Sequence, residues 1–197
     1  MCIRDSMISV MMGNFIKRLG WPARAFPTMN TNYLVCPTFI DAGIGEDGRC
    51  SMVVAKEYGN NWRPASVATN LPLIVDKPVD FGLQDFCDKC KICADACPSG
   101  AIPKGDRKKV RGAWKWQIDS VKCQRFWMTT GHNCSMCQNA CPWNHPNNIL
   151  HNTVREVAEK CTWSRRFVAD MENLFYKKHQ KPGPDPRWMV EELSKFI

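Results

Sequence analysis

The chain has 197 residues, of which 44% are hydrophobic and 23% are charged, so it is expected to fold around a core and is not a disordered chain. No stretch approaches the roughly 18 consecutive apolar residues that a membrane-spanning helix needs. Lys and Arg number 27 against 19 Asp and Glu, and the resulting net charge of +8 is too small for a dedicated nucleic-acid-binding tail.

The first six residues, Met-Cys-Ile-Arg-Asp-Ser, match the translated end of a sequencing adaptor. We expect residues 1–6 to be an artefact, so the start of the chain carries no information about a leader segment or a compartment. After them, apolar residues recur at helical spacing from Val10 to Leu19, and Gly20 follows. This pattern predicts a helix over 8–19.

Residues 7–80 have the short, turn-separated segments of a mixed fold. We expect a loop over 22–37 and a turn at 76–78. Strands are predicted over 51–55, 65–69 and 71–75. Residues 7–80 are therefore predicted to be the end of an α+β domain.

A glycine-rich run, Gly43-Ile-Gly45-Glu-Asp-Gly48, matches the dinucleotide-binding pattern G-x-G-x-x-G. In nucleotide-binding folds that pattern follows a strand and opens a helix. Here a β-like segment follows the glycines instead. The run therefore favours a close-packed loop that ends a helix, and a nicotinamide or flavin site is the weaker alternative.

Eight of the twelve cysteines lie between Cys87 and Cys141, in two blocks that repeat a spacing. The first block, residues 87–98, reads C-x2-C-x2-C-x3-C-P, which is typical of two-cluster bacterial ferredoxins. The second block, residues 134–142, repeats the ending C-x2-C-x3-C-P and is preceded by Cys123. In this pattern the last cysteine of each block binds the cluster of the other block.

Crossing the two blocks predicts two [4Fe-4S] clusters, which would pass electrons one at a time. One is predicted on Cys87, Cys90, Cys93 and Cys141, and the other on Cys97, Cys123, Cys134 and Cys137. Cys161 is the alternative to Cys123 as the eighth ligand. We prefer Cys123 because it directly follows the strand-like residues 116–119. We also expect residues 101–102 to pair with residues 115–118 in a small antiparallel sheet.

Structural zinc and disulfide bonds are the two other uses of closely spaced cysteines. Structural zinc favours C-x2-C pairs and has no use for a third close cysteine or for the C-P endings. Thiols two or three residues apart in helical turns are poorly placed to form disulfides with one another. Both alternatives are therefore weak. The four remaining cysteines are expected to be unpaired core or surface residues: Cys2, Cys36, Cys50 and Cys161.

Residues 148–197 are predicted to be helices that cover the cluster domain of residues 81–147. A capping box at 153–156 predicts a helix that runs towards Lys160. A second helix is predicted to bury Phe167, Met171, Leu174 and Phe175, and a third, from Asp185, to carry Trp188, Met189 and Leu193.

Much of the excess positive charge lies in residues 104–115. Charge runs usually only keep a surface solvated, so we interpret this segment as a solvated loop between the cysteine blocks. The alternative is a docking patch for an acidic electron donor or for RNA.

Several segments, together with the cysteine blocks, resemble the C-terminal half of a corrinoid-dependent reductive dehalogenase. They are residues 19–23, 41–49, 57–59, 67–73, 76–82 and 116–123. The resemblance covers nearly the whole chain from about residue 8. It implies an α+β fold in three parts: the C-terminal part of a nitroreductase-like cobalamin-binding domain over 7–80, a ferredoxin-like two-cluster domain over 81–147, and a helical cover over 148–197.

The resemblance also implies a chemistry. In that family the clusters reduce the cobalt of a base-off cobalamin, which then removes a halide from an organohalide, while a tyrosine and a basic residue serve the substrate side. Arg63 stands where the family carries the basic residue, and Asn30 or Asn32 is expected to add a hydrogen bond. The tyrosine would lie upstream of residue 7.

The implied partners are a small organohalide substrate and an electron donor, which would be reduced ferredoxin, flavodoxin or a quinol-linked chain. The family also implies a small membrane-anchor protein, and no nucleic acid is expected. Proteins of this kind either stay in the cytoplasm or are exported and associate with the membrane, and the sequence does not choose between these compartments.

Two alternatives stay open. Epoxyqueuosine reductase, a tRNA-modifying relative that also joins a corrinoid to two clusters, fits residues 137–144, but it lacks the aromatic insert at 125–127 and carries a longer C-terminal region. A stand-alone ferredoxin is the third hypothesis. It would fail if residues 8–80 fold with the rest and bind a corrinoid.

Overall fold

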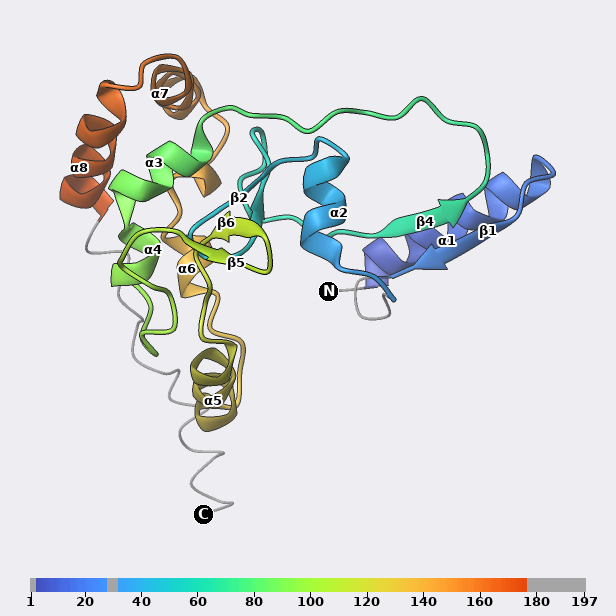
Figure 1. Ribbon diagram of the computed structural model, residues 1–197, viewed down its shortest axis with the longest axis horizontal. Helices are drawn as coiled ribbons and strands as arrows, with labels where there is room; N and C mark the ends of the chain where they lie inside the picture. The colour runs from blue at the N-terminus through green and yellow to red at the C-terminus, as the bar shows by residue number, and fades with distance from the viewer. Residues whose placement is uncertain (1–2, 28–31, 177–197) are drawn as a thin grey trace.

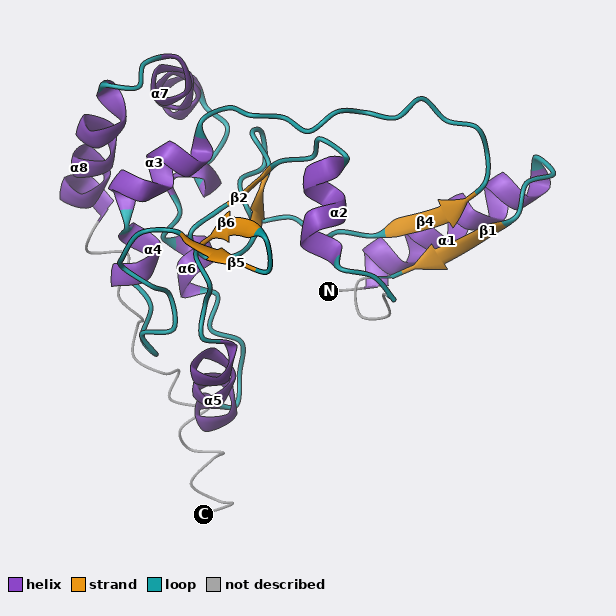
Figure 2. Cartoon of the chain, viewed as in Figure 1, coloured by secondary structure: helices purple, strands orange, loops and turns teal. Residues whose placement is uncertain are grey.

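The computed structural model describes residues 3–27 and 32–176, and in this part the fold mixes helices with three two-stranded sheets (Figures 1 and 2). The helices are α1 (Ile3–Arg18), α2 (Val35–Asp41), α3 (Leu83–Cys90), α4 (Ile92–Asp95), α5 (Ser120–Thr130), α6 (Met136–Asn139), the short 3-10 helix η1 (Pro142–Asn144), α7 (Ile149–Lys160) and α8 (Ser164–Tyr176). The strands are β1 (Ala23–Phe26), β2 (Glu46–Asp47), β3 (Val53–Val54), β4 (Ser66–Thr69), β5 (Lys108–Val110) and β6 (Ala113–Lys115). None of the described helices is long and apolar enough to cross a membrane.

At one end of the molecule α1 packs on an antiparallel pair formed by β1 and β4 (Figure 1). The register joins Ala23 to Thr69 and Phe26 to Ser66. The helix predicted over 8–19 is confirmed, although it begins earlier, and β4 confirms the strand predicted over 65–69.

Two predictions for this region are wrong. The segment 22–37 is not a continuous loop, because β1 and the start of α2 lie within it. The residues that pair with β1 are 40 or more positions away in sequence, so local patterns do not reveal them. No strand forms over 71–75, where Ile74 is 98% exposed, because this stretch finds no neighbouring strand among the described residues.

The glycine-rich run ends α2 and leads into β2, as predicted for a close-packed loop. Gly43 has a φ of +69°, and its N–H bonds the carbonyl of Ile40. A Cβ on Gly45 would lie 2.2 Å from the carbonyl oxygen of Val54, so β3 passes too close for any side chain there. The strand predicted over 51–55 is confirmed as β3, which pairs with β2.

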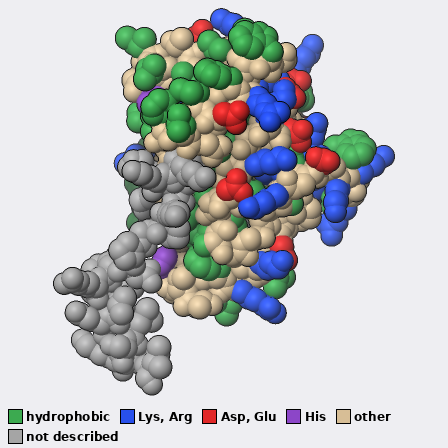
Figure 3. Space-filling model, turned by 90° about the vertical axis from the view of Figure 1, so that its left-hand side faces the viewer, with side chains coloured by type: hydrophobic (Ala, Val, Ile, Leu, Met, Phe, Trp, Pro, Cys, Tyr) green, Lys and Arg blue, Asp and Glu red, His purple; other side chains and the backbone are tan. Residues whose placement is uncertain are grey.

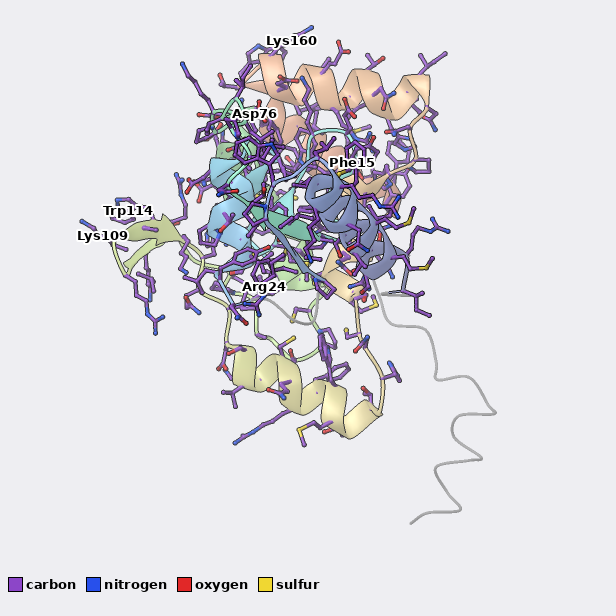
Figure 4. The ribbon with its side chains drawn as sticks, turned by 90° about the vertical axis from the view of Figure 1, so that its right-hand side faces the viewer. Phe15, Arg24, Asp76, Lys109, Trp114 and Lys160 are labelled. Atoms are coloured by element: carbon purple, nitrogen blue, oxygen red, sulfur yellow. The ribbon has the colours of Figure 1, made fainter. Side chains whose placement is uncertain are left out.

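The sheet predicted between the cysteine blocks is displaced. A single hydrogen bond joins the N–H of Asp119 to the carbonyl of Ala101 at 2.9 Å, and the strands are instead β5 and β6. Their tight turn contains Arg111 and Gly112, both with positive φ. Residues 108–115 of the basic segment are therefore a hairpin, and only residues 104–107 form the predicted loop. Figure 4 shows that Lys109 and Trp114 project away from the body of the molecule, and Figure 3 shows Lys and Arg side chains gathered there.

The C-terminal helices correct two details. The N-cap of α7 is Asn148, whose side chain accepts from the N–H of His151 at 2.9 Å, so the capping box at 153–156 lies inside the helix. The predicted buried face of α8 is exposed, with Phe167 and Leu174 at 64% and 74%. The helix buries Val168 and Ala169 instead, because its contacts with α3 and α7 fix its rotation. The third helix, predicted from Asp185, lies outside the described residues.

The largest core cluster sits beneath α3, α7 and α8 and reaches the end of the second cysteine block. Leu83 and Ile92 are fully buried in it. Trp143 packs against Phe81 and Phe86, with ring centroids 5.0 and 6.1 Å away. Burial of these aromatic rings fixes α3 against the segment that follows Cys141.

Candidate functional site

The two cysteine blocks fold as a structural repeat. In the first, Lys91 stands between α3 and α4 with a φ of +54°, and in the second, Ser135 precedes α6 with a φ of +50°. Non-glycine residues with such angles are uncommon and often mark functional sites. Each turn lets the chain change direction between two cysteines of a C-x2-C pair, and α4 and α6 contact each other.

One set of four cysteines gathers where α3, α4 and the end of α6 meet. Burial raises the pKa of the Cys93 thiol, and the charges of Cys50, Cys87, Cys141 and Cys90 raise it further. Burial likewise raises the pKa of Cys141, followed by the charges of Cys50 and Cys87 and then of Cys90. Such coupling requires short separations, so Cys87, Cys90, Cys93 and Cys141 lie together.

The second set comes from the residues just after α4, from α5 and from the residues around the start of α6. Burial raises the pKa of Cys137 to about 12, followed by the charges of Cys50, Cys134, Cys97 and Cys123. A cavity of about 150 Å³ has all four of this set, Cys97, Cys123, Cys134 and Cys137, in its lining. The structure thus brings Cys123, carried by α5, to this cavity. Cys161 instead caps the C-terminus of α7.

The sulfur of Cys97 is the most strongly hydrogen-bonded of the second set. Burial alone would raise its pKa, but the hydroxyl of Ser99 and the backbone N–H groups of Ile102, Ala101 and Ser99 outweigh burial, and the pKa is lowered. The Ser99 hydroxyl lies 3.4 Å from the sulfur. Donors aimed at a sulfur favour its thiolate form, which is the form that binds metal.

Cys50 lies between the two sets, a position that the sequence did not reveal. It is 5% exposed and packs with Cys93, Cys97 and Cys137. Burial raises the pKa of its thiol to about 11, and the charge of Cys87 is the next cause. The side-chain amide of Asn60 donates to its sulfur at 3.5 Å. Cys36, like Cys50 and Cys161, is a free thiol, while Cys2 lies outside the described residues.

An amide network ties residues 59–60 to the end of the second block. The N–H of Asn60 donates to Asn144 Oδ1 at 2.8 Å, and the amide of Gln138 donates to the carbonyl of Asn60 at 3.1 Å. Asn144 donates in turn to the carbonyl of Gln138 at 2.6 Å. Gly59 has a φ of +61°, and a Cβ there would lie 2.0 Å from Asn144 Oδ1. The network therefore fixes the loop that carries Arg63 against the cysteines.

Arg63 is exposed and lines two hollows. One is the cavity of the second cysteine set, and the other is a broad open depression of about 1060 Å³ between α1 and residues 61–65. Gln138 also lines both, so the two hollows adjoin. Asn32 is described and exposed, whereas Asn30 lies outside the described residues, so its predicted role stays a prediction.

Among the described residues, no three His, Cys, Asp or Glu side chains are placed to hold a single metal ion. Zinc in a structural site draws its four ligands around one ion. A cubane spreads its four thiolate ligands over four irons.

Comparisons with known proteins agree with the cysteine pattern. Residues 86–145 match the family model described as a 4Fe-4S dicluster domain. A tetrachloroethene reductive dehalogenase of Sulfurospirillum multivorans is 35% identical over 177 residues, which cover 86% of this chain and 35% of that protein. The chain belongs to the reductive dehalogenase family.

A solved structure agrees with this membership. It is a reductive dehalogenase described for B12-dependent dehalogenation, with a TM-score of 0.80 and 31% identity, covering 83% of this chain and 24% of that one. An epoxyqueuosine reductase of Salmonella typhimurium is also similar, 29% identical over 140 residues, which cover 62% of this chain and 35% of that protein. The chain spans about a third of the length of the dehalogenase of Sulfurospirillum multivorans.

Proposed function

We propose that this chain supplies the electron-transfer part of a reductive dehalogenase, in which two [4Fe-4S] clusters deliver electrons to a corrinoid cobalt that removes halide from an organohalide. The observation that carries the proposal is the gathering of eight cysteines into two sets of four, in a chain of the dehalogenase family. Thiolates at this spacing are the ligands that cubanes use.

The residues present fit two clusters. In the proposal Cys87, Cys90, Cys93 and Cys141 hold the first cluster, and Cys97, Cys123, Cys134 and Cys137 hold the second. The mutual effects of the thiols on one another's pKa support this assignment, because charges that act on one another in this way lie close together. The cavity beside the second set supports the assignment of the second cluster independently, because all four cysteines of that set line it.

A corrinoid, when bound, supplies a cobalt centre whose reduced form takes the halogen. Two observations support the proposal of a bound corrinoid: the likeness to a B12-dependent dehalogenase, and the open depression beside the second cysteine set. Trp62 and Met11 contribute apolar surface to that depression, and Arg63 and Gln138 contribute polar groups. We propose that residues 7–80 form part of a nitroreductase-like corrinoid domain, followed by the cluster domain over 81–147 and the helices from 148.

The proposed partners follow from the same chemistry. A small organohalide is the substrate, and the electrons come from reduced ferredoxin, flavodoxin or a quinol-linked chain. A small membrane-anchor protein is proposed from the family. The proposed catalytic residues on this chain are Arg63 and Asn30.

The proposal predicts halide release. The full-length protein, loaded with iron, sulfide and cobalamin and reduced with methyl viologen, is expected to release halide from tetrachloroethene or a brominated phenol. Ion chromatography would measure the halide, and protein lacking cobalamin is the control. Conversion of epoxyqueuosine in tRNA, with no halide released from either compound, would instead support the tRNA-modifying alternative.

A further inference from the structure

Arg49 is a buried cation at the junction of the glycine-rich loop and the first cysteine block. Its side chain is 1% exposed. The guanidinium donates to the carbonyl oxygens of Cys87 at 3.0 Å and of Pro103 and Gly105 at 2.8 Å each. It also lies 4.5 Å from the ring centroid of Trp116. These contacts hold the charge in one place with its hydrogen-bonding groups satisfied.

The contacts do not neutralise the charge. Within the described residues Arg49 forms one ion pair, with Asp88 at 3.9 Å, and the Asp88 side chain is 44% exposed. An exposed carboxylate at this distance is screened by water, so it offsets the guanidinium charge only weakly. A buried charge is unfavourable unless a counter-charge offsets it, so a nearby anion would stabilise this site.

Arg165 is a second buried arginine in the same molecule, and it allows a comparison with Arg49. Its side chain is 7% exposed, and it donates to the carbonyls of Ala158 and Glu159 at 2.7 and 3.0 Å. Its carboxylate partner, Asp85, is as exposed as Asp88 (47%), but it lies at 2.5 Å, within hydrogen-bonding distance, whereas Asp88 lies at 3.9 Å from Arg49. The two residues thus share burial and carbonyl contacts and differ in their counter-charge.

The first cysteine set lies beside Arg49, since the guanidinium donates to the carbonyl of Cys87 at 3.0 Å, and a cluster on this set would be the anion. Burial raises the pKa of Cys87 to about 12 and the charge of Cys90 adds to this, while a hydrogen bond from the backbone N–H of Arg49 and the guanidinium charge both lower it. The guanidinium also acts on Cys90, where it opposes the effect of burial. Arg49 therefore contacts this set through its backbone and its side chain.

We propose that Arg49 is the buried counter-charge of the first cluster and raises that cluster's reduction potential. The inference rests on the proposed function only in that Cys87, Cys90, Cys93 and Cys141 hold a cluster. A cubane with four thiolates is an anion that gains one more negative charge on reduction. A fixed positive charge and hydrogen bonds to sulfur favour the more negative state. The second set has no buried guanidinium of this kind among its described neighbours, since Arg63 in its cavity lining is exposed.

The test separates charge from packing by potentiometric titration of the cluster-loaded protein, followed by EPR. Arg49→Gln removes the charge. At a fixed potential the reduced-to-oxidised ratio of the first cluster is expected to fall tenfold, which is about 59 mV for a one-electron couple. The second cluster is expected to keep its potential. Arg49→Lys keeps the charge and loses the fork of hydrogen bonds, so it is expected to lower stability and to shift the ratio much less.

Arg165→Gln is the matched control and is expected to lower the unfolding temperature without moving either potential. Unchanged potentials in Arg49→Gln with full iron content would reduce Arg49 to a packing role and overturn the proposal. If Arg49→Gln does not retain the first cluster, the lysine variant decides: retention of the cluster there supports the counter-charge, and its loss contradicts it. Absence of iron in the unmodified protein would overturn the proposed function itself, before the variants are compared.

Discussion

Serine in place of Cys97 is expected to abolish the second cluster and to leave the first intact. Cys97 belongs to the first sequence block, but it lies with Cys123, Cys134 and Cys137 around one cavity. Serine is a poor ligand for iron, so the protein should lose the cluster on this set. With that cluster it should lose about half of its iron. EPR of the dithionite-reduced protein and iron analysis would measure the effect.

Two further variants complete this test. Cys141→Ser should have the mirror effect, because its charge acts with those of Cys87, Cys90 and Cys93. Cys36→Ser is the control, since Cys36 lies outside both sets and should keep both clusters. Loss of the first cluster in Cys97→Ser, with survival of the second, would show that the crossing is inverted.

Alanine in place of Arg63 is expected to slow dehalogenation by about 100-fold in the full-length enzyme, with iron and corrinoid content unchanged. Departure of a halide and delivery of a proton both develop negative charge, which a guanidinium stabilises without losing its own proton. The loss of one such electrostatic donor typically costs two to three powers of ten in turnover. Arg63 has access to the depression proposed for the corrinoid.

Steady-state kinetics would separate this role from a structural one. The effect should fall mainly on kcat, and Arg63→Lys should restore part of it because the charge returns. Lys56→Ala is the matched surface control, since Lys56 is 55% exposed and pairs with Glu159 away from both hollows. Full turnover in a properly loaded Arg63→Ala enzyme would show that Arg63 is a solvated surface residue with no catalytic role.

Local spacing was sufficient to predict that the two cysteine blocks fold in the same way. A C-x2-C pair is short enough for one turn to set its geometry, and the repeated positive φ at Lys91 and Ser135 shows that the two blocks use the same turn. The loop at Gly43 and Gly45 was also predictable, because glycine adopts a positive φ at little cost and only glycine fits a backbone approach of 2.2 Å.

Long-range packing decided the features that the sequence did not reveal. The face of α8 that is buried contains Arg165 and Glu172, which find partners on Asp85 and His145 and therefore leave Phe167 outside. The strand β1 depends on a partner distant in sequence. Arg49 carried no motif of its own beyond its glycine-rich loop, and its importance became visible only when the carbonyl of Cys87 and the ring of Trp116 were placed around it.

The metal content of the unmodified protein tests the central claim, that two sets of four cysteines hold two cubanes. Protein reconstituted under anaerobic conditions should contain about eight iron atoms per chain, and its reduced EPR spectrum should show two [4Fe-4S] centres. Zinc in place of iron, or a single cluster with about four iron atoms in fully reconstituted protein, would contradict the account.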